Sequence, residues 1–206
     1  MSIIRKHMVE EQLSSRDISD KRVLAAFKKI PRHAFIPTEH LDEAYNDYPI
    51  PIGLGQTISQ PYMVALMAQS AKLKGKEKVL EIGAGSGYGA AILSKLAKKV
   101  VSIERHKELA EKAEEVLKKL GITNVKIIVG DGTKGYARES PYGAIIVTAY
   151  AEEPPKALID QLKENGRLVI PLGNEFSQDL IVITKTRKGL KEYSVCGCRF
   201  VPLVED

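Results

Sequence analysis

Short apolar runs recur through the middle and the end of the chain, and glycine, proline or charged residues bound each run. Such a run is typical of a strand that is buried on both faces of a sheet. The predicted strands lie at residues 79–82, 100–104, 124–129, 144–148 and 167–171. Because βα-type units connect them, we expect a parallel sheet with right-handed crossovers.

The segments between and after these strands complete the predicted fold. Residues 88–99 repeat apolar side chains at helical spacing, and residues 154–162 predict a shorter helix. After the last of these strands, residues 180–186 and 193–204 flank a turn and predict an antiparallel hairpin at the sheet edge. The pattern therefore predicts an α/β fold: a Rossmann-like, doubly wound, mostly parallel sheet with helices on both faces.

The chain before residue 75 has a different pattern. Residues 15–30 predict one amphipathic helix, and residues 61–73 predict a second helix that opens with a proline. Residues 31–55 are rich in proline and glycine, but their apolar side chains favour a loop packed on the core over a free linker. We expect an N-terminal extension over residues 1–74 and a ligand-binding core over residues 75–206.

A glycine-rich loop joins the first core strand to its helix. Gly83, Gly85 and Gly87 let the backbone approach a nucleotide-like ligand, or they serve only close packing of strand and helix. A dinucleotide fingerprint needs a third glycine where Tyr88 stands. The carboxylate of Glu81 would repel a pyrophosphate, and it would attract a ligand that carries an ammonium and a sulfonium. These features favour S-adenosylmethionine.

Acidic residues follow the next two strands, at the sheet edge where ligands of open α/β sheets bind. Glu104 stands about twenty residues after the glycine loop, the spacing at which a carboxylate can accept both ribose hydroxyls. Asp131 lies between two glycines and can accept from an adenine amine. The alternatives are a solvated acid at a helix start for Glu104 and a turn residue for Asp131.

Ser59 precedes the proline that opens a predicted helix, and two interpretations remain open. The hydroxyl can cap the helix, because serine is favoured at that place. It can also help to hold a substrate carboxylate, because a helix N-terminus attracts anions.

Composition narrows the class of protein. The 206 residues are 44% hydrophobic, and no apolar run approaches the roughly twenty residues of a membrane span. Residues 1–21 are too polar for a signal peptide, so we expect a cytoplasmic protein without membrane contact. Cys196 and Cys198 share one face of a strand and are interpreted as buried thiols. The net charge of +5 invites a nucleic-acid function, but interleaved acidic and basic residues favour a solvated, ion-paired surface.

Several motifs together resemble one family. They include the Thr-Ile-Ser segment and the Phe-Val-Pro-Leu tail, which are particular to that family. The matching motifs are Tyr45 and residues 49–53, 55–61, 79–88, 130–132, 146–149 and 200–203. Over nearly its whole length the chain looks like a protein-L-isoaspartate O-methyltransferase. Tyr150 departs from the pattern, because alanine is more frequent there in the family.

The resemblance implies transfer of a methyl group from S-adenosylmethionine to the α-carboxylate of L-isoaspartyl residues in damaged proteins. The ester then closes to a succinimide, whose hydrolysis returns part of the material to normal aspartate. An ionised carboxylate and a sulfonium donor need neither a general base nor a metal, so we expect no metal site.

The resemblance also implies the site residues. Ser59 is the expected catalytic residue and orients the substrate carboxylate. The expected donor-binding residues are Thr57, Ile58, Ser59, Glu81, Gly83, Gly85, Ser86, Gly87, Glu104, Arg105, Asp131 and Gly132. The expected substrate-binding residues are Ile52, Gly53, Val147, Thr148 and Ala149, with Tyr150 beside them.

Two rival classes remain. A nucleic-acid methyltransferase usually carries Asn or Asp, two prolines and an aromatic after the fourth strand, whereas residues 152–156 read Glu-Glu-Pro-Pro-Lys. A non-catalytic nucleic-acid-binding protein is the other class. We expect no nucleic-acid partner, and we expect a monomer.

Overall fold

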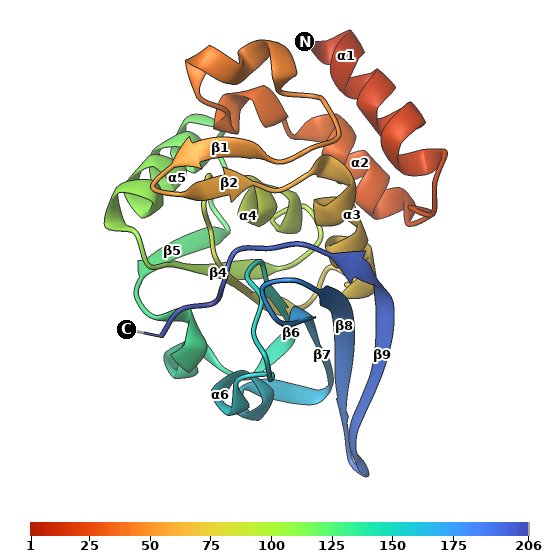
Figure 1. Cartoon of the computed structure of the whole chain (residues 1–206), viewed down its shortest axis with the longest axis vertical. Helices are drawn as coiled ribbons and strands as arrows, with labels where there is room; N and C mark the ends of the chain where they lie inside the picture. The colour runs from red at the N-terminus through yellow and green to blue at the C-terminus, as the bar shows by residue number, and fades with distance from the viewer. Residues whose placement is uncertain (206) are drawn as a thin grey trace.

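The computed structural model describes residues 1–205, and its centre is a seven-stranded sheet in the order β5-β4-β3-β6-β7-β8-β9 (Figure 1). The strands are Lys78–Ile82 (β3), Lys99–Glu104 (β4), Val125–Val129 (β5), Tyr142–Val147 (β6), Leu162–Gly173 (β7), Gln178–Thr186 (β8) and Gly189–Cys198 (β9). Strands β3 to β7 pair in parallel, and β8 and β9 continue the sheet antiparallel. The predicted Rossmann-like fold class and its edge hairpin are confirmed.

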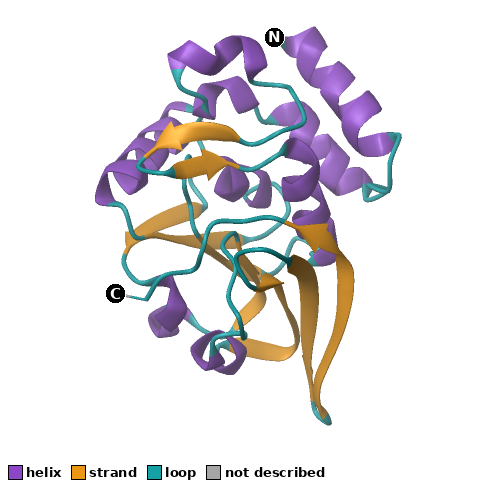
Figure 2. Cartoon of the chain, viewed as in Figure 1, coloured by secondary structure: helices purple, strands orange, loops and turns teal. Residues whose placement is uncertain are grey.

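Side chains alternate between the two faces of the sheet and build one hydrophobic cluster on each. Val79 of β3 joins the cluster that contains side chains of the larger helices, and its neighbour Leu80 joins the cluster that contains Leu158. The larger cluster is covered by α2 (Lys21–Lys29), α3 (Pro61–Ser70), α4 (Tyr88–Leu93) and α5 (Lys107–Lys119). The shorter α6 (Lys156–Asp160) covers the opposite face (Figure 2).

The N-terminal extension packs on the larger cluster. Met8, Phe27 and Phe35 are buried in it together with side chains of the sheet. The short elements of the extension are α1 (Ser2–His7), the π-helix η1 (Met8–Ser14), the 3-10 helices η2 (Arg32–Phe35) and η3 (Thr38–Glu43), and the antiparallel strands β1 (Ile50–Gly53) and β2 (Gln56–Ile58). The predicted packing of residues 31–55 on the core is therefore confirmed.

The predicted single helix at residues 15–30 is wrong. The side chain of Asp20 accepts from the backbone N–H groups of Arg22 and Val23, so α2 begins only at Lys21. Residues 2–14 form helical turns that the sequence pattern did not predict. Helix α4 likewise ends at Leu93, well before the predicted residue 99, because Lys99 already begins β4.

The last strand also differs from its prediction. β9 begins at Gly189, directly after a tight turn, and ends at Cys198 instead of running to residue 204. Residues 199–204, here called the tail, leave the sheet and run beside the loop after β6. The backbone of Tyr150 donates to the Val201 carbonyl at 2.8 Å and accepts from the Leu203 N–H at 2.7 Å. Phe200 packs against the larger cluster, so an apolar contact draws the tail away from the sheet edge.

Candidate active site

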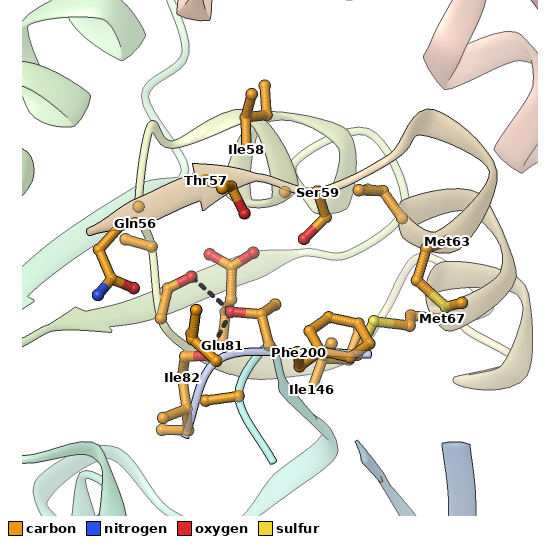
Figure 3. A pocket seen from close by; sticks show the side chains of 18 of the residues that line it. Gln56, Thr57, Ile58, Ser59, Met63, Met67, Glu81, Ile82, Ile146 and Phe200 are labelled. Atoms are coloured by element: carbon orange, nitrogen blue, oxygen red, sulfur yellow. Dashed lines mark hydrogen bonds between the residues drawn. The ribbon is translucent and has the colours of Figure 1, made fainter. Parts of the chain in front are cut away.

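A cavity of about 580 Å³ lies at the carboxyl ends of the parallel strands. Its walls come from distant parts of the chain: the segment before α3, α3 itself, the glycine loop after β3, the ends of β4, β5 and β6, and the tail. This volume is typical of a site for one small molecule. The cavity is therefore the candidate active site (Figure 3).

The glycine loop contributes both to the cavity and to packing. Gly83 lines the cavity with a φ of 91°, and a Cβ on it would lie 2.3 Å from the Thr148 hydroxyl oxygen. Gly85 also lines the cavity, whereas Gly87 does not. A Cβ on Gly87 would lie 3.0 Å from the Cβ of Ala113, so this glycine allows α5 to pack closely. The packing interpretation therefore holds for Gly87, while Gly83 and Gly85 lie where the ligand-binding interpretation needs them.

Glu81 places a buried carboxylate in the cavity wall. The residue is 1% exposed, and the Ser102 hydroxyl donates a hydrogen bond to one of its carboxylate oxygens. Burial raises the pKa of Glu81 to about 8; the Ser102 hydrogen bond opposes this, and the negative charge of Glu104 adds to it. A cation bound in the cavity would favour the ionised carboxylate.

Glu104 lies at the cavity as predicted. Its carboxylate accepts from the Gly85 N–H at 2.8 Å and from the His106 N–H at 3.0 Å, which ties the end of β4 to the glycine loop. Arg105 also lines the cavity, as do Ser86 and Gly132. The ends of β4 and β5 thus bring the predicted carboxylate of Glu104 and the predicted Gly132 to the same cavity.

Asp131 has a different place in the structure. It caps the short 3-10 helix η4 (Gly132–Lys134), accepting from the backbone N–H and the hydroxyl of Thr133 at 2.8 and 2.6 Å. Lys134 pairs with its other oxygen at 2.7 Å. Asp131 does not line the cavity, so the structure shows the turn role that was the alternative interpretation.

The segment before α3 presents hydroxyls to the cavity. The side chains of Thr57 and Ser59 point inward, whereas Ile58 points the opposite way (Figure 3). Helix α3 has Gln60 at its N-cap and no capping side chain there. Within residues 1–205 the Ser59 hydroxyl makes no hydrogen bond, so the interpretation of Ser59 as a helix cap is wrong.

Only some of the predicted substrate-binding residues line the cavity. Thr148 and Ala149 line the cavity, but Ile52, Gly53 and Val147 do not. The side chain of Val147 belongs to the cluster on the opposite face, because successive residues of a strand alternate between faces. Ile52 instead packs against the glycine loop, with its Cδ1 3.4 Å from the position of a Cβ on Gly85.

Several apolar residues of the cavity were not predicted as site residues. Met63 and Met67 come from one face of α3, Ile146 comes from β6, and Phe200 comes from the tail (Figure 3). Their signals were present as helical spacing and as part of the tail motif, but neither signal tells a cavity wall from a core. Together they give this side of the cavity an apolar surface.

The lining suits a nucleoside ligand that carries positive charge. Glu81 offers a buried carboxylate to a cation, Glu104 offers a carboxylate at the place expected for ribose hydroxyls, and the glycines leave room for close approach. S-adenosylmethionine has these features, so the donor set fits it. Among residues 1–205, no group of three His, Cys, Asp or Glu is placed to hold a metal ion.

The two cysteines are less buried than the sequence predicted. Cys196 and Cys198 are free and only partly buried, and burial raises the pKa of Cys198, which lines the cavity, to about 12.

In the part of the chain that the structure describes, no helix is both long and apolar enough to cross a membrane.

Comparisons with known proteins agree with each other. A family model described as protein-L-isoaspartate(D-aspartate) O-methyltransferase matches residues 3–206. A protein-L-isoaspartate O-methyltransferase of Geobacter metallireducens is 54% identical over 98% of this chain and 94% of its own length. A solved structure described as protein-L-isoaspartate O-methyltransferase superposes with a TM-score of 0.86 at 31% identity, over 98% of this chain and 65% of the other. The chain therefore spans about two thirds of that structure's length.

A second solved structure covers the two chains more evenly. It is a Plasmodium falciparum protein described as a protein-L-isoaspartate O-methyltransferase in complex with S-adenosyl-L-homocysteine. It superposes with a TM-score of 0.85 at 30% identity, over 98% of this chain and 99% of its own.

Proposed function

The chain belongs to the protein-L-isoaspartate(D-aspartate) O-methyltransferase family, and from that premise we propose how its cavity carries out the reaction. The protein is a methyltransferase that uses S-adenosylmethionine and esterifies the α-carboxylate of L-isoaspartyl residues in damaged proteins. The ester initiates repair through a succinimide. The inward Ser59 hydroxyl, beside a cavity that fits the donor, is the observation that best supports the proposed site.

We propose that the donor lies between the glycine loop and the strand ends. Glu81 faces its positive charge, Glu104 accepts from its ribose hydroxyls, and Gly83, Gly85 and Gly132 admit it closely. The rest of the donor-binding wall comes from Thr57, Ile58, Ser86 and Arg105. Contacts of the donor with Gly87, and of its adenine with Asp131, remain predictions. When bound, the donor supplies a methyl group activated by a positively charged sulfur.

We propose that Ser59 donates a hydrogen bond to the substrate carboxylate and thereby fixes its direction of approach. The carboxylate is ionised at neutral pH and needs no base, so positioning carries the rate. The apolar side chains of Met63, Met67 and Phe200 keep water from competing for the carboxylate. Thr148 and Ala149 lie beside the incoming peptide, while contacts of Ile52, Gly53 and Val147 with it remain predictions.

Paired peptides that differ only in Asp versus isoAsp test this function. With labelled donor, the isoAsp peptide should be methylated at least about a hundredfold faster, because the extra backbone methylene changes where the carboxylate lies. Comparable rates on both peptides would overturn the repair assignment.

Variants of Ser59 form the second arm of the same assay. Ser59→Ala should lower kcat by about tenfold to a thousandfold with little change in melting temperature, because the serine caps no helix. Ser94→Ala is the matched control, since the Ser94 hydroxyl is buried and donates to the Ala91 carbonyl away from the cavity lining. It should lose stability and keep its rate. A wild-type kcat in Ser59→Ala would remove Ser59 from the reaction.

We propose that two parts of the chain have different roles. Residues 1–74 form the substrate-side extension, and residues 75–206 form the donor-binding core. The monomeric state, the cytoplasmic location and the absence of a nucleic-acid partner remain predictions from the sequence. DNA binding that survives about 200 mM salt would revive a nucleic-acid function.

A further inference from the structure

The N-terminus of α3 is satisfied from outside the helix. An α-helix leaves its first N–H groups without partners, and a side chain usually accepts from one of them. Here the carboxylate of Asp47 does so, since its Oδ1 accepts from the Tyr62 N–H at 3.1 Å. Asp47 belongs to the loop before β1, so the cap comes from a different part of the extension. A carboxylate is also the favoured charge at a helix N-terminus.

The second oxygen of Asp47 holds the residue next to Ser59. Oδ2 accepts from Gln60 Nε2 at 2.7 Å and from Arg16 Nη1 at 3.1 Å. The Asp47 side chain is about one-quarter exposed, so this cluster is only partly screened by water. Arg16 in turn stacks over the Tyr62 ring, with its Cζ 3.3 Å from the ring centroid. The carboxylate thus fixes Gln60 and Tyr62, the residues on either side of Pro61, and Gln60 directly follows Ser59.

This arrangement leaves Ser59 free for another partner. The N-cap position of α3 is Gln60, whose side chain caps no helix N–H group, and Ser59 lies one residue further out. Because the Asp47 carboxylate supplies the cap and also holds the Gln60 side chain, the Ser59 hydroxyl is left to point into the cavity, as Figure 3 shows. We propose that Asp47 is a positioning residue: it caps α3 from outside the helix and, through Gln60, sets the direction of the Ser59 hydroxyl. The inference rests on the proposed function of Ser59.

The test compares two aspartates that cap helices. Asp47→Ala should lower kcat at saturating peptide and donor by about tenfold or more, because a displacement of about 1 Å can cost a hundredfold. Its affinity for S-adenosyl-L-homocysteine should stay within about twofold, since Asp47 does not line the cavity. Asp20→Ala is the matched control, because the Asp20 carboxylate also accepts from N–H groups at the start of a helix, α2, and does not line the cavity. It should lower the melting temperature comparably and keep kcat within about twofold.

A conservative variant separates positioning from stability. Asp47→Asn keeps one acceptor, for the Tyr62 N–H, but it loses the oxygen that accepts from Gln60 and the charge that faces Arg16. It should recover part of the kcat lost in Asp47→Ala, and the remaining deficit should grow as salt decreases. A wild-type kcat in Asp47→Ala would overturn the inference.

Failure of the proposed function gives a different result. A wild-type protein that does not methylate isoAsp peptide contradicts the proposed function directly. Amide hydrogen exchange in the ligand-free protein then tests the cap alone. The Tyr62 amide should exchange faster in Asp47→Ala than in Asp20→Ala, and equal rates in both would overturn the role of Asp47.

Discussion

Glu81 is a buried acid whose titration couples the stability of the free protein to pH. Its pKa rises from 4.5 to about 8 through burial, so between these values the native state holds a proton that the unfolded chain has lost. This contribution to stability is complete below pH 4.5 and is lost as pH rises through about 8. Glu81→Gln should remove on the order of a few kcal/mol of pH dependence between pH 5 and pH 8.5, measured by urea unfolding.

The control for this prediction is an exposed acid. Glu111 on α5 is largely exposed, so Glu111→Gln should leave the pH dependence unchanged. If Glu81→Gln keeps the full pH dependence of the free energy of unfolding, groups other than Glu81 cause that dependence.

Individual site residues were predictable where the signal was local. Glu104 could be predicted because strand ends in a parallel sheet meet at one edge. The roles of Gly83 and Gly87 could not be separated, because they depend on Thr148 and Ala113, which come from distant segments. That the Val147 side chain lies outside the cavity lining could not be predicted for a related reason: the motif identifies a strand end, but only the register of the sheet decides which side chain faces the cavity.

At the scale of elements, α3 organises the extension through Gln69. Its Oε1 accepts from the Ser19 and Asp20 N–H groups at 2.8 Å each, and its Nε2 donates to the Asp17 carbonyl at 3.0 Å. Gln69→Ala should destabilise the protein by about 1 to 2 kcal/mol, because the partly buried Asp20 N–H and the exposed Ser19 N–H lose their acceptor. The change should appear in the chemical unfolding midpoint, with kcat nearly unchanged.

Gln69→Glu is the comparison for this variant. The carboxylate still accepts from both N–H groups but cannot donate to Asp17, so its loss should be smaller than that of alanine. An equal loss in both variants would locate the stabilisation elsewhere.

The same contacts explain why the helix boundary was mispredicted. The apolar spacing of residues 15–30 is compatible with one helix, but Gln69 holds the backbone of residues 17–20 in an extended turn. Such a side chain lies far away in sequence and leaves no local signal. Strands β3 to β6, whose apolar runs are local, were predicted to within two residues of their ends, whereas β7 and β9 were not.

For the whole molecule, the cavity links segments from Pro49 to Val204. A ligand in it should therefore stabilise the entire chain against unfolding. S-adenosyl-L-homocysteine at about a hundred times its Kd should add about 2.7 kcal/mol to the free energy of unfolding. Calorimetry should show one transition that moves upward, since residues on both sides of position 75 share one hydrophobic cluster. Two transitions, only one of them sensitive to the ligand, would contradict this.

The attachment of the tail has a consequence in time. Backbone hydrogen bonds to Tyr150 hold residues 201–203 in the cavity wall, and a short segment held in this way opens far more often than the sheet unfolds. Because residues 201–203 line the cavity, we expect the frequency of this opening to set how fast spent donor leaves and fresh donor enters. An enzyme whose substrates are scarce tolerates such slow exchange, because it can wait already loaded for the next damaged residue.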